Sequence, residues 1–196
     1  MRPAGKGALE SLYFDYPRFA ARRVPELDGA TARHRVLIVG AGPIGMTAAL
    51  VLARYGIRSV LIDRKDTFND GSRAICLARP SMHILERIGA VAPFLDKALG
   101  WRFGRSYYRG EQIFQLEMPQ PPGEKYLPMY NLQQQYIEKY LHDAVAANDL
   151  IDMRWQSELT AIEPGDGGVS VRIASPEGDY RLDAAYVLAA DGARSP

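Results

Sequence analysis

The sequence has little cysteine and no excess of charge of either sign. Its one cysteine, Cys76, excludes an internal disulfide, and the first thirty residues contain no continuous apolar leader, so a reducing, cytoplasmic setting is predicted. Lysine and arginine number 24 against 23 acidic residues, and the resulting net charge of +1 gives no reason to expect nucleic acid or an anionic membrane as a partner. His34, His83 and His142 lie too far apart for zinc spacing, so no metal site is predicted.

An unbroken hydrophobic run is also missing. The uncharged stretch from Val36 to Ala53 is long enough to suggest a membrane helix, but three glycines and a proline fall within residues 40–45. A spanning helix needs roughly 20 residues that all stay helical, because lipid offers no partner for broken backbone hydrogen bonds. The stretch therefore predicts a soluble element rather than a membrane span.

What the stretch does contain is a strand, a glycine turn, a helix and a second strand. Residues 36–39 are large aliphatics typical of a buried parallel strand, residues 46–55 favour a helix, and residues 59–63 form a second apolar run. Between the first strand and the helix, Gly40, Gly42 and Gly45, with Pro43 and Ile44, fit the pattern G-x-G-x-x-G. In this context the pattern predicts dinucleotide binding, with the diphosphate at the helix N-terminus.

Asp63 ends the second strand at the distance where such folds place an acid that accepts hydrogen bonds from the adenosine ribose. Its carboxylate would repel a 2′-phosphate, which favours FAD or NAD over NADP as the bound nucleotide. Arg64, the next residue, is a further candidate for cofactor binding.

The rest of the chain departs from a repeated strand and helix pattern. Residues 65–80 read as a polar loop and residues 81–89 as a helix opening at Ser81. Alternating aromatic and polar residues over 101–118 predict antiparallel strands, followed by an irregular crossing to residue 128 and a helix over 131–148. Residues 158–192 predict three antiparallel strands. The expected fold class is α/β, a Rossmann-like parallel sheet with an antiparallel meander and a fragment of a β-rich domain.

Four segments resemble the FAD-dependent aromatic-ring monooxygenases, the flavoprotein hydroxylases typified by p-hydroxybenzoate, phenol and 3-(3-hydroxyphenyl)propionate hydroxylases. The segments are VLIVGAGPIGMTAALVLARYGIRSVLIDR, GSRAICLARPSMHILERIG, NLQQQYIEKYL and YVLAADGARSP. Residues 1–34 read as an N-terminal extension, in which the stretch SLYFDYPRFA packs on the surface without forming a core of its own. The resemblance implies an FAD-binding domain made of 35–100 and 129–196 and a partial substrate-domain excursion over 101–128.

The resemblance also implies roles for residues outside the glycine turn. Arg73 aligns with an arginine that reaches the FAD phosphates, and Gln134 with a glutamine on the flavin side, although Gln133 and Gln135 compete for that position. Asp191, followed by Gly192, aligns with the aspartate that helps to bind the FAD diphosphate. The aromatic residues of 101–114 are open to two interpretations, a substrate cavity or strand packing, and no catalytic residue is assigned.

By resemblance, the function is that of the FAD-binding part of a monooxygenase that hydroxylates a phenolic substrate with NAD(P)H and O2. The alternatives are another FAD-dependent oxidoreductase of the same fold, a dehydrogenase or a halogenase, and an inactive nucleotide-binding fragment. The only expected partner is a small aromatic substrate, with a homo-oligomer left open.

Family members continue beyond the equivalent of Pro196, so we expect this chain to be a fragment or a truncated product. On its own it is expected to bind FAD weakly or not at all, because the missing segment contributes to the flavin site. Absorbance in the flavin bands after gel filtration with FAD measures this, and a stoichiometric, tightly held flavin would contradict it.

Overall fold

The computed structural model describes residues 14–70 and 75–192. The chain divides into two compact units, one formed by residues 1–70 and 141–196 and the other by residues 71–140. The first unit contains the two predicted strands and the meander, and the second contains the hairpin. These units do not test the predicted domain boundaries, which stay a prediction.

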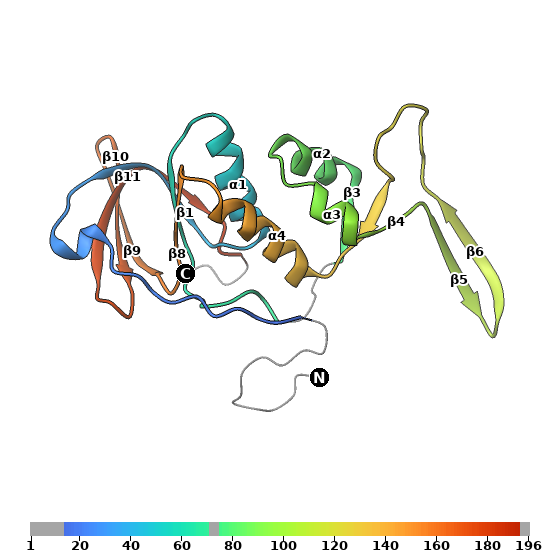
Figure 1. Ribbon diagram of the computed structural model, residues 1–196, viewed down its shortest axis with the longest axis horizontal. Coiled ribbons are helices and arrows are strands. Elements are labelled where there is room, and N and C mark those ends of the chain that lie inside the picture. Colours follow the sequence, from blue (N-terminus) through green and yellow to red (C-terminus); the bar gives the residue numbers. More distant parts are fainter. Residues whose placement is uncertain (1–13, 71–74, 193–196) are drawn as a thin grey trace. The chain divides into compact units, whose positions relative to one another are not determined.

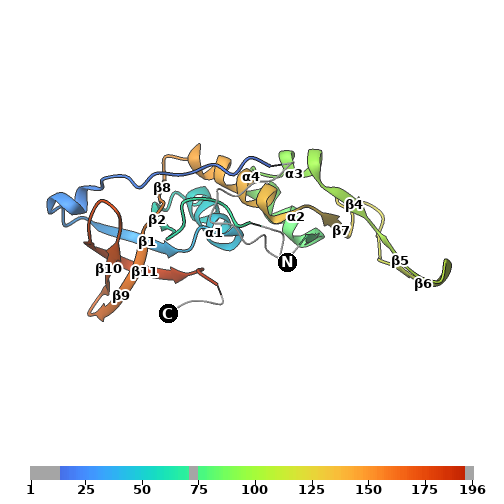
Figure 2. The same cartoon turned by 90° about the horizontal axis from the view of Figure 1, so that it is seen from below.

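A six-stranded sheet in the order β8-β2-β1-β11-β10-β9 forms the first unit (Figure 1). The strands are β1 (Arg33–Val39), β2 (Ser59–Ile62), β8 (Ile151–Arg154), β9 (Glu158–Gly165), β10 (Gly168–Ala174) and β11 (Tyr180–Ala189). Strands β8, β2, β1 and β11 pair parallel with their neighbours in this order, whereas β10 pairs antiparallel with both β11 and β9. Figure 2 shows β9, β10 and β11 together beside β1. The predicted fold class, a parallel sheet extended by an antiparallel meander, is confirmed.

The two central strands are buried because both faces of the sheet are covered. Leu37 and Ile38 of β1 and Leu61 and Ile62 of β2 are fully buried. Helix α1 (Pro43–Arg54) packs against β2 with an Ala- and Leu-rich face. The helix begins at Pro43 and not at residue 46 as predicted, because proline has no N–H to satisfy and suits the first turn of a helix.

The parallel strands share a core with β10 and β11 of the meander and with residues 14–28, named here the N-terminal strap. Val24 of the strap is 4% exposed and joins the core formed by alternate residues of β1, β2, β10 and β11. A short 3-10 helix, η1 (Pro25–Asp28), ends the strap. The sequence predicted an extension without a core of its own, and η1 gave no signal there because a four-residue helix shows no periodicity.

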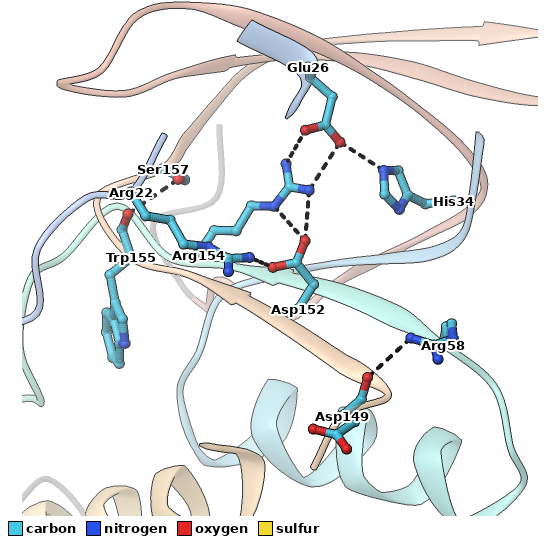
Figure 3. Close-up of polar contacts among 9 residues, drawn as sticks. All are labelled: Arg22, Glu26, His34, Arg58, Asp149, Asp152, Arg154, Trp155 and Ser157. Atoms are coloured by element: carbon cyan, nitrogen blue, oxygen red, sulfur yellow. Dashed lines mark hydrogen bonds and ion pairs between the residues drawn. The ribbon is translucent and has the colours of Figure 1, made fainter. Parts of the chain in front are cut away.

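A buried ion cluster attaches the strap to β8 (Figure 3). The side chain of Arg154 is 2% exposed and donates to both carboxylate oxygens of Glu26, at 3.0 and 3.1 Å, and to Asp152. His34 lies 2.8 Å from Glu26, and Arg22 pairs with Asp152. The cluster satisfies both sides of a guanidinium that would otherwise be costly to bury.

The second unit holds a three-stranded sheet, two helices and a hairpin. Its elements are β3 (Cys76–Ala78), α2 (Arg79–Arg87), α3 (Ala92–Lys97), β4 (Leu99–Trp101), β5 (Phe103–Tyr108), β6 (Glu111–Glu117) and β7 (Met129–Asn131). Strands β3 and β4 pair antiparallel with β7, and β5 pairs antiparallel with β6. Helix α4 (Gln134–Ala146) begins in this unit and ends in the first one.

Three local predictions for this region were wrong. Helix α2 begins at Arg79 rather than at Ser81, because Pro80 occupies its first turn. Strand β3 lies where a loop was expected, and β7 covers residues 129–131, so α4 starts three residues later than predicted. Three-residue strands are stabilised by their partners rather than by local propensity, which hides them from a reading of the sequence.

The predicted antiparallel strands over 101–118 are present as the hairpin. Trp101 donates from Nε1 to Asn131 at 2.8 Å, whereas Phe103, Tyr107, Tyr108 and Phe114 are 42–60% exposed. Within the described residues these four rings therefore line no closed core, and the two interpretations of them stay open.

The ion cluster makes the stability of the chain depend on pH. Burial alone raises the pKa of the Glu26 carboxyl, but hydrogen bonds from Arg154 and His34 outweigh it and hold that pKa below its usual range. A carboxyl with a lowered pKa stabilises the fold above its unfolded value, about 4.3, and this contribution is lost as pH falls through the folded pKa. We expect Glu26→Ala to lower the free energy of unfolding at pH 7 by about 3–5 kcal/mol, because Arg154 stays buried without its partner.

Urea unfolding at pH 7 and at decreasing pH measures this effect. The difference between Glu26→Ala and the unaltered chain should shrink as pH falls below about 4. Asp28→Ala, which removes an exposed carboxylate of the same strap, is the control and should leave the midpoint unchanged. An equal loss in both variants would contradict the assignment.

Candidate functional site

The turn between β1 and α1 requires glycine at its first position. Gly40 has φ +101° and donates its N–H to Ile62 O at 2.8 Å. A Cβ at this position would lie 2.6 Å from the carbonyl oxygen of Ala190 at the end of β11. Only a residue without a side chain can therefore pass between the ends of β2 and β11.

The third glycine of the pattern lets the helix close onto the turn. A Cβ at Gly45 would lie 1.9 Å from the carbonyl oxygen of Gly40 and 3.4 Å from Cγ2 of Ile38. Both Gly40 and Gly45 are thus needed by the fold itself, independently of any ligand.

Gly42 differs from its two neighbours in the pattern. Its φ is −79°, which any residue can adopt, and apart from its two neighbours no atom of residues 14–70 and 75–192 lies within 4 Å of the Cβ that it lacks. The fold alone gives no reason for glycine here. A ligand that approaches the backbone closely does, which is the role of the second glycine in a diphosphate-binding turn.

The first turn of α1 suits an anion. Gly42 is its N-cap and forms no side-chain cap, and no acidic residue lies in the first turn, which begins Pro43-Ile44. The backbone amides and the positive end of the helix dipole are therefore not neutralised by a carboxylate of the helix itself. Ile44 is 73% exposed beside this turn.

Asp63 joins the end of β2 to the glycine turn. Asp63 is 7% exposed. Its Oδ2 accepts a hydrogen bond from Ala41 N–H at 2.8 Å, and its Oδ1 accepts one from Lys65 N–H at 2.9 Å. A carboxylate has about four lone-pair positions, so two stay available for hydroxyl groups of a sugar. The geometry fits the predicted ribose contact and adds a structural role that the sequence did not indicate.

Arg64 and Asp191 lie on either side of this arrangement. The side chain of Arg64 is 54% exposed and lies 3.7 Å from Glu158. Asp191 follows β11, and its Cα would lie 2.7 Å from a Cβ on Gly40. Gly192, the last described residue, has φ +85°.

The structure thus brings the glycine turn, Asp63 and Asp191 to the carboxyl ends of three adjacent parallel strands. Strand β1 lies between β2, which follows it through α1, and β11, which comes from the distant meander. Ligands of open α/β sheets bind outside the carboxyl ends of strands at such a position.

Two predicted residues belong to other parts of the chain. Gln134 lies in the second unit, at the start of α4, and donates from Nε2 to Glu138 Oε1 at 2.8 Å. Gln133 is exposed, and Gln135 is half-buried with an Oε1 that has no partner among the described residues, so the choice among the three stays a prediction. Arg73 lies outside the described residues.

Residues that position Asp63 were missing from the sequence prediction. Asp63 N–H donates to Arg154 O at 3.0 Å, and Ser157 N–H donates to Asp63 O at 2.8 Å. These contacts are made by backbone groups far along the chain, so no side-chain pattern could have indicated them.

Residues 14–70 and 75–192 contain no group of three or more histidine, cysteine, aspartate or glutamate side chains able to hold a metal ion. Over the same ranges, no helix has both the length and the apolar character that crossing a bilayer demands. Cys76 is exposed, and its Sγ donates to Asn131 Oδ1 at 3.3 Å.

Comparison with known proteins agrees with this geometry. A 3-(3-hydroxy-phenyl)propionate/3-hydroxycinnamic acid hydroxylase of Mycolicibacterium smegmatis is 29% identical over 161 residues, which are 82% of this chain and 28% of the relative. A second hydroxylase of this name from Burkholderia vietnamiensis is 32% identical over 84% of this chain and 30% of its own length. The para-nitrophenol 4-monooxygenase of a Pseudomonas species is 26% identical over 82% of this chain and 40% of its own length.

Solved structures show the same fold. The p-nitrophenol 4-monooxygenase of Pseudomonas putida matches with a TM-score of 0.77 and 24% identity, over 85% of this chain and 42% of that one. The flavin-dependent monooxygenase PieE, solved with FAD and substrate, matches with a TM-score of 0.74 and 29% identity, over 85% of this chain and 31% of that one.

The family model described as "FAD binding domain" matches residues 33–196, which include the glycine turn, Asp63 and Asp191. The predicted resemblance and the predicted FAD cofactor are therefore confirmed. The chain belongs to the family of FAD-binding domains found in flavin-dependent aromatic hydroxylases.

Proposed function

We propose that this chain supplies the FAD-binding part of a monooxygenase that hydroxylates a phenolic ring with NAD(P)H and O2. The observation that carries the proposal is Gly42, a glycine that the fold does not need and that a diphosphate does. The named activities of the relatives, hydroxylation of 3-hydroxyphenylpropionate and oxygenation of p-nitrophenol, support the phenolic substrate.

The residues of the first unit divide the binding of FAD between them. Backbone amides of the turn and of the first turn of α1 hold the diphosphate, and Asp63 accepts from the ribose hydroxyls. Asp191 lies beside the same turn and contributes to the diphosphate end, while Arg64 and, in the other unit, Gln134 are further proposed contacts. When bound, FAD supplies the redox chemistry, and the protein supplies position and electrostatics.

The chain spans between about a quarter and two fifths of the length of the relatives that it matches. Activity, substrate and electron donor therefore belong to the proposal. A cytoplasmic location, inferred from the single cysteine, is part of the same proposal. A dehydrogenase or halogenase of the same fold is less well supported, because the relatives named above are hydroxylases and monooxygenases.

A substitution at Gly42 separates the role of this glycine in the fold from its role in binding FAD. Gly42→Ala should leave the free energy of unfolding nearly unchanged, within about 1 kcal/mol, because the new Cβ meets no atom of the described residues beyond its neighbours. It should weaken FAD binding by about tenfold or more, because the Cβ occupies the approach of the diphosphate.

Gly45→Ala is the matched comparison. Its Cβ meets the Gly40 carbonyl, so this variant should lose about 1–3 kcal/mol of stability through overpacking. Urea unfolding of both variants measures stability, and fluorescence titration with FAD of the gene product that contains each substitution measures binding. Unchanged FAD affinity in Gly42→Ala would remove the main support for the diphosphate site.

The gene product that contains these residues should oxidise NADH or NADPH faster when a phenol is added, consume O2 and release the hydroxylated phenol. Pyridine nucleotide absorbance, an oxygen electrode and product chromatography measure the three quantities. Substrate oxidation without incorporation of oxygen would favour a dehydrogenase, and a requirement for halide would favour a halogenase.

A further inference from the structure

The N-terminal strap lies outside the part of the chain that defines the family. The family model begins at residue 33, whereas the strap comprises Phe14–Asp28. The strap nevertheless makes specific contacts with the segment that follows Asp63.

The first set of contacts is with the loop of residues 64–68. Phe19 N–H donates to Asp66 O at 2.7 Å, and Arg18 Nη1 lies 2.7 and 2.8 Å from the two carboxylate oxygens of Asp66. The rings of Phe14 and Phe19 lie 6.3 and 5.3 Å from that of Phe68, which is 2% exposed. The loop is therefore attached to the strap by backbone, ionic and aromatic contacts.

The second set of contacts is with the residues that follow β8. The ring of Phe19 stacks on that of Trp155, with centroids 4.4 Å apart and planes inclined by 9°. Gln156 donates from Nε2 to Phe19 O at 2.9 Å. Figure 3 shows the Trp155 ring directed away from the ion cluster, so Phe19 and Glu26 hold two separate points of the same strand end.

The two segments that the strap contacts, the loop 64–68 and the residues after β8, are hydrogen-bonded to Asp63 and to each other. Lys65 N–H donates to the Asp63 carboxylate, and Gln156 N–H donates to Lys65 O at 3.0 Å. Ser157 N–H donates to Asp63 O at 2.8 Å. The loop and the end of β8 thus enclose Asp63, and Phe19 holds the loop against the end of β8.

We propose that the N-terminal strap is a positioning element for the adenosine end of the FAD site. Phe19 and Arg18 act as positioning residues, through Asp66 and Trp155, on the carboxylate of Asp63. This inference rests on the proposed role of Asp63 in binding the ribose. Fixing that carboxylate before the ligand arrives raises affinity, because less conformational freedom is lost on binding.

The first experiment needs no ligand. Hydrogen exchange of the Ala41 and Lys65 amides reports on their bonds to Asp63. Exchange of both should be faster in Phe19→Ala and Arg18→Ala and unchanged in Arg23→Ala. Arg23→Ala is the matched control, because its ion pair with Asp28 lies wholly within the strap. Equal exchange in all three variants and the unaltered chain would overturn the proposal.

The second experiment uses the gene product that contains these residues and measures its affinity for FAD, for ADP as the adenosine half and for FMN as the flavin half. Phe19→Ala should weaken FAD and ADP by the same factor, about tenfold, and leave FMN unchanged. Arg18→Ala should weaken both by about threefold, with partial recovery in Arg18→Lys, since that pair is exposed and its removal leaves the core intact.

The outcomes distinguish this inference from the proposed function. FAD and ADP binding that is equal in Phe19→Ala, Arg18→Ala and the unaltered chain would overturn the positioning role while leaving the FAD site in place. A parallel loss for FMN would also overturn it, because it would reveal general loosening. A gene product that contains these residues unaltered and binds neither FAD nor ADP would overturn the proposed function, and with it the assignment of the strap to a cofactor site.

Discussion

The hydrogen bond from Ala41 N–H to the Asp63 carboxylate, at 2.8 Å, is the contact on which the arrangement of the site depends. It joins the glycine turn after β1 to the end of β2, two points that the sheet alone brings near but does not align. A buried carboxylate needs hydrogen-bond donors, and a tight turn leaves backbone amides without internal partners. Each therefore satisfies the other, and the carboxylate keeps acceptor positions for a sugar. One residue thus serves both the fold and the ligand.

Two of the three glycines in the turn are required by the close packing of the same segments. Gly40 has no room for a side chain because the end of β11 lies against it, and Gly45 has none because the helix closes onto the carbonyl of Gly40. Since these two are explained by packing, they are weak evidence for a cofactor. Gly42 is the informative one, because a Cβ there would contact no other part of the described residues. A glycine pattern gains functional meaning from the position at which the fold does not require glycine.

Local chemistry made the first unit predictable from sequence. The apolar runs of β1 and β2, the glycine turn and the turn residues of the meander each carry a signal within ten residues. Strands β3 and β7 carry none, because three residues pair only where tertiary structure supplies a partner. The partners of Asp63 at residues 154–157 were unpredictable for the same reason, since their contacts use backbone atoms. Gln134 was assigned by resemblance alone, and Arg73 lies outside the described residues.

The charges of the strap decide its register more than its stability. Phe14, Phe19 and Val24 supply apolar contact, which is nondirectional and would tolerate a shift along the sheet. Arg154 and Glu26 tolerate none, because a displaced strap would leave a guanidinium that is 2% exposed without its carboxylate. Such a pair gains little net free energy over apolar residues, but its loss is costly, so it penalises every alternative alignment. With register set by Glu26 at one end, Phe19 meets Trp155 and Asp66, the two contacts through which the strap reaches Asp63.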